Sequence, residues 1–548
     1  MGIKLKAPKW VIAGTAVAAV MALTAAGVVV SGVVGGGGPQ PEDVMPANAM
    51  AFTKLDLNPS AGQKLAVFQL AAKFPKVKAK VTSTDTSIKE SVFGSMFTGN
   101  GKDSLGLNYK KDVEPWLGDR IGVGVFPAFP GDKVPEIGIA IAFTDHDAAK
   151  VALDKVIAFQ AKEKAKEKAK EKAKSASEAA LDGVGTKSDA PGDSTTSSLP
   201  PAVATALSAP TGYAFTDDGY VIVSETTATA TKLAAAGKTA PLATSAKYAQ
   251  DIKTLGEDQI GVAWADVAAV VKGMPKDPLT QLGAAGGGPL ALLQGKLNGV
   301  NDPKNATGRV IMGLHADSSF VEVTGKAIEL KGINAAKTDL GTSAAMIGSF
   351  PSQVFGAVSI TGLGKAVGAL YTAFTKDGDT FQIKSALDAM GITSAKQIET
   401  VLGAETGITV AGNKDNPEFA LRTRGSNPDE AVSLVRKVLD VLGPDPSVPA
   451  ISATKITGPD GIVVSMGKDL NAAILDKSGS KLASTQGFKQ VIAGGPADFA
   501  AYVNLGTVIP LIPSDKPADS ASLKPFNALG MTVTGGTVPT VRFRISVK

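Results

Sequence analysis

The longest hydrophobic segment of the chain runs from residue 10 to residue 34 and contains no charged side chain. A helix of about 20 apolar residues is enough to cross a hydrocarbon core roughly 30 Å thick. Three lysines precede this segment within residues 1–9, and acidic residues follow it at positions 42 and 43. This asymmetry predicts a single-pass anchor with a cytoplasmic N-terminus and an extracytoplasmic body. Small residues at 22–26 leave cleavage as the alternative.

Beyond the anchor, short alternating segments predict strands, and segments with a period of 3.6 residues predict helices. Ile137, Ile139 and Ile141 alternate with small residues in one predicted strand, and residues 431–442 form an amphipathic helical pattern. In the last strand, the alternation predicts that the apolar residues Val541, Phe543 and Ile545 point inward and that the arginines between them point outward. The strand at 419–424 has a similar pattern, which predicts that Ala420, Arg422 and Arg424 form a solvated face.

The order of these patterns occurs twice along the chain. The matching segments are 49–57 with 353–360, 113–123 with 398–408, 217–223 with 459–464, 247–270 with 487–511, and 308–330 with 528–548. Hairpins interrupted by single helices predict an α+β fold, in which two tandem copies each have a mostly antiparallel sheet with helices packed on one face. Whether the copies share a sheet edge is left open.

This repetition predicts the domain organisation. The predicted parts are a basic cytoplasmic tail (1–9), the anchor (10–34), a Gly/Pro linker (35–43), repeat 1 (44–330), a joint (331–344) and repeat 2 (345–548). Repeat 1 carries an insertion at 161–205, in which a charged Ala-Lys-Glu-Lys helix at 161–174 is followed by a flexible loop. We expect this charged helix to be a solvated extension of the helix before it.

Composition narrows the chemistry. The chain contains no cysteine, which excludes disulfides, thiolate nucleophiles and cysteine metal sites. The net charge of +5 comes from the N-terminal tail, which carries +3, and from residues 161–174, which carry +4, so the rest of the chain carries −2. A nucleic-acid-binding face would need an excess of basic residues. We therefore expect no nucleic acid partner.

Candidate catalytic groups are few. The two histidines, His146 and His315, are predicted to be surface or structural residues, because no second histidine lies near either. Ser452 and Lys455 match a Ser-x-x-Lys motif, but in a strand context where the two side chains do not converge. The glycines of 362–368 resemble a phosphate-binding loop without completing its pattern, so we expect a tight turn from strand to helix.

Two aspartates stand just before predicted helices. Asp56 and Asp266 could suggest paired carboxylates, but their counterparts in the second copy are Ser359 and Asn504. All of these residue types can cap a helix N-terminus, which predicts a capping role. Trp116 and Trp264 are expected in the core and Trp10 at the membrane interface. The sequence therefore assigns no catalytic, cofactor-binding or metal-binding residue.

Several segments resemble a family of uncharacterised, single-span envelope proteins from high-GC Gram-positive bacteria, grouped as a domain of unknown function. They are the anchor, the glycines 35–38, and the segments 46–52, 55–60 and 115–120. The resemblance covers essentially the whole chain outside the charged insertion and implies a tethered extracytoplasmic body without known catalytic residues. We expect a non-enzymatic protein that interacts with envelope components. The alternatives are a carrier of a lipid or another apolar ligand and, less favoured, an envelope hydrolase.

Overall fold

The structure is a computed structural model of the full chain. It describes residues 38–56, 60–74, 107–130, 135–180, 212–256, 259–273, 307–331, 341–376, 385, 387–413, 416–425, 427–443, 450–456, 461–492, 494–511 and 523–548. The predicted anchor at 10–34 lies outside these residues, as do the tail at 1–9 and the loop part of the insertion. Among the helices that are described, none is both long and apolar enough to cross a membrane.

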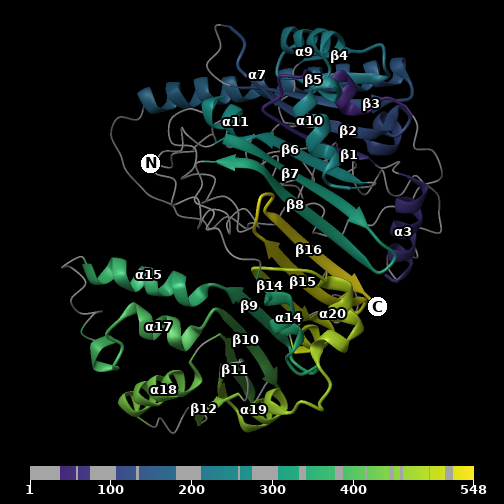
Figure 1. Ribbon diagram of the computed structural model, residues 1–548. Coiled ribbons are helices and arrows are strands. Elements are labelled where there is room, and N and C mark those ends of the chain that lie inside the picture. The colour runs from purple at the N-terminus through teal and green to yellow at the C-terminus, as the bar shows by residue number, and fades with distance from the viewer. Residues whose placement is uncertain are drawn as a thin grey trace. The chain divides into compact units, whose positions relative to one another are not determined.

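The chain divides into two compact units (Figure 1). Unit 1 comprises residues 1–72, 76–316 and 327–334, and unit 2 comprises residues 73–75, 317–326 and 335–548. Both are mixed α+β, and every strand pair recorded in their sheets is antiparallel, as the sequence predicted.

Unit 1 contains strands from β1 to β7 with helices before and between them. Its elements are α2 (Pro41–Val44), β1 (Ala51–Asp56), α3 (Ala61–Ala72), β2 (Leu117–Phe126), β3 (Glu136–Phe143), α7 (His146–Ala180), β4 (Gly212–Phe215), β5 (Tyr220–Ser224), α9 (Thr227–Thr239), α10 (Ala246–Lys253), β6 (Gly261–Asp266), α11 (Val267–Gly273) and β7 (Thr307–Ala316). Its strand order is β7-β6-β1-β2-β3-β5-β4. The predicted charged helix at 161–174 is part of α7, so that prediction is confirmed.

Unit 2 contains the first residues of β8 (Phe320–Lys331), up to Lys326, and all later elements. These are α14 (Ser343–Gly348), β9 (Gly356–Thr361), α15 (Leu363–Lys376), α17 (Ala395–Leu402), β10 (Glu405–Gly412), β11 (Pro417–Arg424), α18 (Pro428–Leu442), β12 (Ile451–Lys455), β13 (Ile462–Met466), α19 (Lys468–Leu475), α20 (Gln486–Val491), β14 (Phe499–Asn504), α21 (Leu505–Val508), β15 (Phe526–Thr534) and β16 (Thr540–Val547). Its strand order is β12-β13-β11-β10-β9-β14-β15-β16-β8.

The strands of the two units follow the same order over seven strands. If β9 is taken as the counterpart of β1, and the later strands are matched in chain order, the order β15-β14-β9-β10-β11-β13-β12 of unit 2 reproduces that of unit 1. The match extends to irregular backbone: Leu242 donates its N–H to the carbonyl of Met45, and Leu482 donates to that of Phe350 in the same way. Residues on the seven matched strands therefore have definable counterparts in the other unit.

One face of each sheet is covered by helices and forms the core. In unit 1, α2, α9 and α10 cover a cluster that contains Phe52, Phe126 and Trp264, all buried. In unit 2, α14, α19 and α20 cover the equivalent face around Phe350 and Tyr502. Trp116 is also buried, so both core tryptophans were predicted correctly.

Three other helices of unit 2, α15, α17 and α18, do not join this layer. Figure 1 shows α15, α17 and α18 grouped together, apart from α14, α19 and α20. Gly364 and Gly368 lie four residues apart on α15, and added Cβ atoms there would lie 2.7 Å from the Gly403 carbonyl oxygen and 3.2 Å from that of Ala395. These glycines therefore allow close packing of α15 on α17. The helices of unit 2 form two groups, which differs from the single-face arrangement that we expected.

Candidate functional site

Two largely buried ion pairs lie beneath α2 in unit 1. Lys54 Nζ contacts Glu42 Oε1 at 2.5 Å, and Arg120 Nε contacts Asp56 Oδ2 at 2.9 Å. All four side chains are largely buried. With Tyr220 they form what we call the unit 1 ion cluster.

The antiparallel register places these residues together. Asp56 of β1 lies opposite Arg120 of β2, and Lys54, two residues before Asp56, points to the same face of the sheet. The Pro39 carbonyl oxygen accepts hydrogen bonds from Tyr220 Oη at 2.9 Å and from Arg120 Nη1 at 3.5 Å. The cluster therefore fastens the segment that enters unit 1 to its sheet.

Burial dominates the electrostatics of this region. It raises the pKa of the Tyr220 hydroxyl well above its ordinary range, and the pKa of the buried Tyr248 hydroxyl is raised by the same cause with the Glu42 carboxylate as a further contribution. Burial alone would lower the pKa of Arg120, but the hydrogen bond and charge of Asp56 outweigh it, and that pKa is raised. Both tyrosines are neutral and Arg120 is charged at physiological pH.

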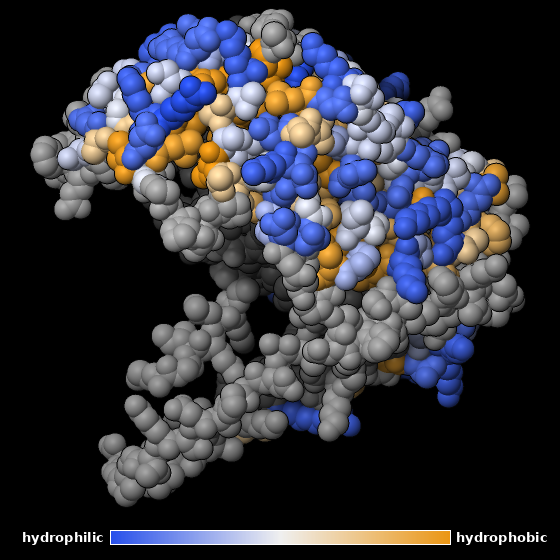
Figure 2. Space-filling model, turned by 90° about the horizontal axis from the view of Figure 1, so that it is seen from below, coloured by the Kyte–Doolittle hydropathy of each residue, from blue (hydrophilic) through white to orange (hydrophobic). Residues whose placement is uncertain are grey.

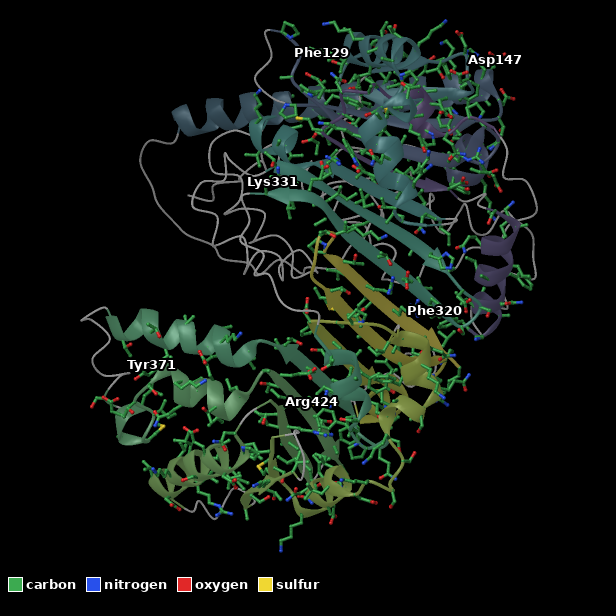
Figure 3. The ribbon with its side chains drawn as sticks, in the orientation of Figure 1. Phe129, Asp147, Phe320, Lys331, Tyr371 and Arg424 are labelled. Atoms are coloured by element: carbon green, nitrogen blue, oxygen red, sulfur yellow. The ribbon has the colours of Figure 1, made fainter. Side chains whose placement is uncertain are left out.

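Unit 2 has a different set of residues at the same positions. Register matches Lys54 to Ser359, Asp56 to Thr361, and Arg120 to Glu405. Glu405 accepts a hydrogen bond from Thr342 Oγ1 at 2.6 Å and pairs with Arg424, labelled in Figure 3, at 3.3 Å. Since the same fold forms without the ion cluster, the cluster is a particular property of unit 1.

At the start of α3, the side chain that accepts a first-turn N–H is Ser60, at 3.4 Å from the Gln63 nitrogen, rather than the predicted Asp56. Its carboxylate is engaged by Arg120 on the neighbouring strand, and its counterpart by register is Thr361 rather than Ser359. The prediction holds for the other pair: Asp266 Oδ1 accepts from the N–H of Ala269 at 3.0 Å, and Asn504 Oδ1 accepts from the N–H of Thr507 at 3.3 Å.

The most unusual surface is the second face of the unit 2 sheet, opposite its core. The register aligns apolar residues across the strands in two adjacent rows, with Gly356 in the first. The first row contains Ile451, Met466, Phe419, Val410, Val503, Leu529, Ile545 and Val321, and the second contains Ala453, Val464, Leu421, Ile408, Val358, Ala501, Met531, Phe543 and Val323. We call these two rows the apolar face.

None of these side chains is fully buried. Ile408, Phe419 and Ile451 are 40%, 41% and 42% exposed. Alternate residues on the core face, such as Ala420 and Ala500, are buried. A solvated face of an antiparallel sheet normally carries polar residues. A continuous, half-exposed apolar face is typical of a binding surface.

The sequence predicted the opposite orientation for two of these strands. Arg542 and Arg544 lie on the core face, where both contact Glu322 of β8, at 3.2 and 2.6 Å. Arg422 also lies on the core face, where it is buried and donates to Ser349 Oγ at 2.7 Å. The predicted inward positions of Val541, Phe543 and Ile545 were therefore wrong. The predicted solvated face of Ala420, Arg422 and Arg424 was also wrong, because Ala420 and Arg422 are buried and Arg424 pairs with Glu405. The physical reason is that carboxylate and hydroxyl partners pair with these arginines beneath the helices.

A signal for this arrangement was present in the sequence. Glu322 lies directly opposite Arg544 in the register, so opposite charges on paired strands share one face. Such pairing indicates a covered, ion-paired face. In unit 1 the equivalent second face is buried, as Ile139, Ile141 and Val221 show, so the exposed apolar face distinguishes unit 2.

The other sequence candidates do not converge on a site. His315 Nδ1 lies 3.0 Å from Gln63 Nε2, whereas the exposed His146 lies beside Phe215 with its Nδ1 3.0 Å from Asp147 Oδ1. Ser452 lies on the core face and contacts Ser465 Oγ at 3.0 Å, whereas Lys455 is on the other face and pairs with Asp429.

The glycine segment at 362–368 is explained by packing. Gly362 has a φ of +77°, which allows the tight turn into α15 that we predicted. Among the described residues, no group of three or more His, Cys, Asp or Glu side chains is placed to hold a metal ion.

The geometry therefore defines a mixed α+β protein built of two units with one strand order, of which the second exposes an apolar sheet face. The chain belongs to a family described as a protein of unknown function (DUF3352), whose model matches residues 10–295. This agrees with the expected domain of unknown function, although the match ends at residue 295 rather than covering essentially the whole chain. Comparisons with curated proteins and with solved structures gave no match.

Proposed function

We propose that this protein is a non-enzymatic, membrane-anchored extracytoplasmic protein of the cell envelope that binds an apolar ligand on the apolar face of unit 2. The observation that carries the proposal is the pair of apolar rows, which contain no ionisable side chain and are only half-buried. The anchor at 10–34 supplies the membrane location, and unit 2 is a divergent second copy of the fold of unit 1. No nucleic acid partner is proposed.

The contacts of the polar groups support binding rather than catalysis. The ion cluster consists of side chains that neutralise one another and hold residues 39–44, and the Ser452 and Lys455 side chains lie on opposite faces of a strand. A catalytic nucleophile needs a base within hydrogen-bond reach.

The chemistry of the apolar face favours the acyl chain of a lipid as the ligand. Protein interfaces combine apolar contacts with about one hydrogen bond per 100–200 Å², and so contain polar groups. The two rows offer aliphatic, methionine and phenylalanine side chains, which suit a ligand without hydrogen-bonding groups. Each CH₂ group buried against them would contribute about 0.8 kcal/mol.

A second candidate is the scaffold role that the sequence favoured, with an envelope protein as the occupant of the same face. The width of the apolar face favours this candidate, because nine strands spaced about 4.8 Å apart span roughly 38 Å. That width exceeds what one acyl chain covers.

Site-specific photocrosslinking distinguishes the two candidates, because the chain has no cysteine of its own. Phe419→Cys in the full chain, labelled with a benzophenone maleimide, is irradiated in membranes of the producing cell. Val151→Cys is the matched control, since Val151 is an exposed apolar residue on α7.

An adduct of lipid mass at position 419, and not at position 151, supports the carrier. A recurring adduct with one protein species supports the scaffold. Equal or no labelling at the two positions refutes both. Recovery of the intact protein in the cytosolic fraction would independently refute the membrane anchor.

A further inference from the structure

We propose that unit 2 binds a phosphate group on the core face of β15, β16 and β8, through Arg542 and with Lys326 and Thr532 beside it. The group is that of inorganic phosphate or of an organic phosphate monoester such as a lipid headgroup. The site lies on the opposite face of the sheet from the apolar face, and the proposal does not depend on the function proposed above.

The strand register brings these side chains together. Arg542 on β16 lies between Thr532 on β15 and Thr324 on β8, and Lys326 lies two residues further along the same face, opposite Thr540. Directly opposite residues on one face are about 5 Å apart, and diagonal neighbours are about 7–8 Å apart. A guanidinium, an ammonium and a hydroxyl group are therefore within reach of one small anion, and all of them belong to unit 2.

Positive charge exceeds negative charge at this place. Arg542 and Arg544 both contact one carboxylate oxygen, Glu322 Oε2, at 3.2 and 2.6 Å. The other oxygen of Glu322 accepts a hydrogen bond from Thr324 Oγ1 at 2.8 Å. Protonated Lys326 is a third cation on the same face, so three positive charges share one negative charge, which leaves a net charge of +2.

The two arginines differ in how far their hydrogen-bond donors are used. Arg544 Nη1 donates to the Gln490 carbonyl oxygen at 3.2 Å, and the guanidinium carbon of Arg544 lies 4.3 Å from the ring centroid of Phe320, labelled in Figure 3. Arg542 Nε is buried and makes no hydrogen bond despite its contact with Glu322. Among the described residues, none accepts a hydrogen bond from the terminal nitrogens of Arg542. A guanidinium has five N–H donors, so Arg542 retains the donors that an oxyanion needs.

Partial burial distinguishes these cations from ordinary surface charges. Hydrophilic residues cover much of the described surface in Figure 2, where water solvates them. The Arg542 side chain is only 34% exposed, and Lys326 is half-buried. Burial and the neighbouring charge of Arg542 lower the pKa of the Lys326 ammonium, against a smaller opposing contribution from Glu322. The two cations therefore destabilise each other, and an anion bound beside them would relieve this repulsion.

Unit 1 provides an internal comparison. Register places Gly313 of β7 at the position of Thr532, so that unit 1 has no hydroxyl there. The arginine of β7, Arg309, contacts two carboxylates, Asp251 at 2.7 Å and Glu329 at 2.9 Å. The excess of positive charge therefore belongs to unit 2 and does not follow from the fold that the two units share.

The chemistry of the group favours phosphate over a carboxylate. A guanidinium binds either anion through two parallel hydrogen bonds. A phosphate monoester carries a charge of about −1.5 to −2 near neutral pH, which matches the net charge of the site, whereas a carboxylate carries only one negative charge. Phosphate also has further oxygens, which can accept hydrogen bonds from Lys326 and from the Thr532 hydroxyl.

The experiment measures binding of inorganic phosphate to the full chain in nonionic detergent by isothermal titration calorimetry, with chloride holding the ionic strength constant. Arg542→Gln removes the guanidinium but leaves Arg544 in contact with Glu322, so the sheet retains an ion pair. Arg436→Gln is the matched control, because Arg436 is an exposed arginine on α18 of the same unit. Thr532→Val removes one hydroxyl with little change in volume.

We expect saturable binding to the wild-type chain and to Arg436→Gln. Arg542→Gln should bind phosphate about 10- to 100-fold more weakly, because charge-assisted hydrogen bonds are lost. Thr532→Val should bind about five-fold more weakly, the equivalent of one neutral hydrogen bond. Circular dichroism shows whether each variant is folded. If Arg542→Gln unfolds, Lys326→Gln and Thr532→Val decide the question, and unchanged affinity in both would overturn the proposal.

A second titration identifies the source of the phosphate group. Glycerol 3-phosphate carries the monoester of a lipid headgroup without its acyl chains. If it binds more tightly than inorganic phosphate, the ligand is an organic monoester, and if the two bind equally, the ligand is free phosphate. Both results support the site when Arg542→Gln weakens them. Acetate that binds as tightly as phosphate, phosphate binding that Arg542→Gln leaves unchanged, or no saturable binding to the wild-type chain would overturn the proposal.

Discussion

The ion cluster of unit 1 leads to a quantitative prediction for Arg120→Met. This substitution removes the cation from a pair whose side chains are only 9% and 12% exposed, and leaves the Asp56 carboxylate beneath α2. Removing one partner of a buried ion pair costs about 3–5 kcal/mol, because the remaining charge is desolvated without compensation. The substitution also removes one of the two donors to the Pro39 carbonyl oxygen.

Urea and thermal unfolding of the full chain, followed by circular dichroism, measure this loss. At about 2 °C per kcal/mol for a unit of this size, we expect the melting temperature of unit 1 to fall by roughly 6–10 °C. Proteolysis near residue 39 should accelerate as the entry segment is released.

Two further variants test the cause of this loss. Asp56→Leu combined with Arg120→Met removes both charges and should recover much of the stability, since an apolar pair of similar volume replaces the ions. Lys238→Met breaks the exposed pair with Asp217 and should change the free energy of unfolding by less than about 1 kcal/mol. A loss below about 1 kcal/mol for Arg120→Met, or no recovery in the double variant, would refute the reasoning.

Three more predictions concern stability. Tyr248→Phe introduces the residue type that unit 2 has at Phe488. Because the pKa of Tyr248 is raised in the folded state, its contribution to wild-type stability is complete below the unfolded pKa of about 10 and falls above it. Urea unfolding between pH 8 and 11 should therefore show a smaller alkaline loss of stability in the variant. Gly237→Ala places a Cβ atom 2.0 Å from the Val44 carbonyl oxygen and should cost about 1–3 kcal/mol in urea unfolding, whereas an unchanged midpoint would contradict this packing. Asp266→Ala removes the cap of α11 and should cost about 1 kcal/mol, with Asp266→Asn retaining most of the stability.

Periodicity predicted the elements of this fold well, because alternation and helical spacing are local properties. The strand at Ile137–Ile141 and the amphipathic helix at 431–442 both occur. The N-terminal caps of α7 and α18 are formed by Asp145 and Asn427. Asp145 accepts from the Ala148 N–H at 2.9 Å, and Asn427 accepts from the Glu430 N–H at 3.5 Å. Boundaries at this scale depend on single hydrogen bonds, which spacing does not specify.

Orientation could not be read from a single strand. In β16 the apolar residues from Val541 to Ile545 alternate with two arginines, but the choice of buried face depends on Glu322, which lies more than 200 residues earlier in the chain. The ion cluster escaped prediction for the same reason, because Asp56 and Arg120 meet only through strand register. The apolar face became visible only when the rows of several strands were aligned.

The position of the entry segment has a mechanical consequence. Residues 39–44 are held to β1 and β5, and β1 lies between β2 and β6 in the interior of its sheet. A force that pulls on the chain ahead of Pro39 must first rupture the contacts of Tyr220 and Lys54. It then loads a strand whose backbone hydrogen bonds on both sides have to break before unit 1 can be unravelled, so the molecule should resist extension from this end.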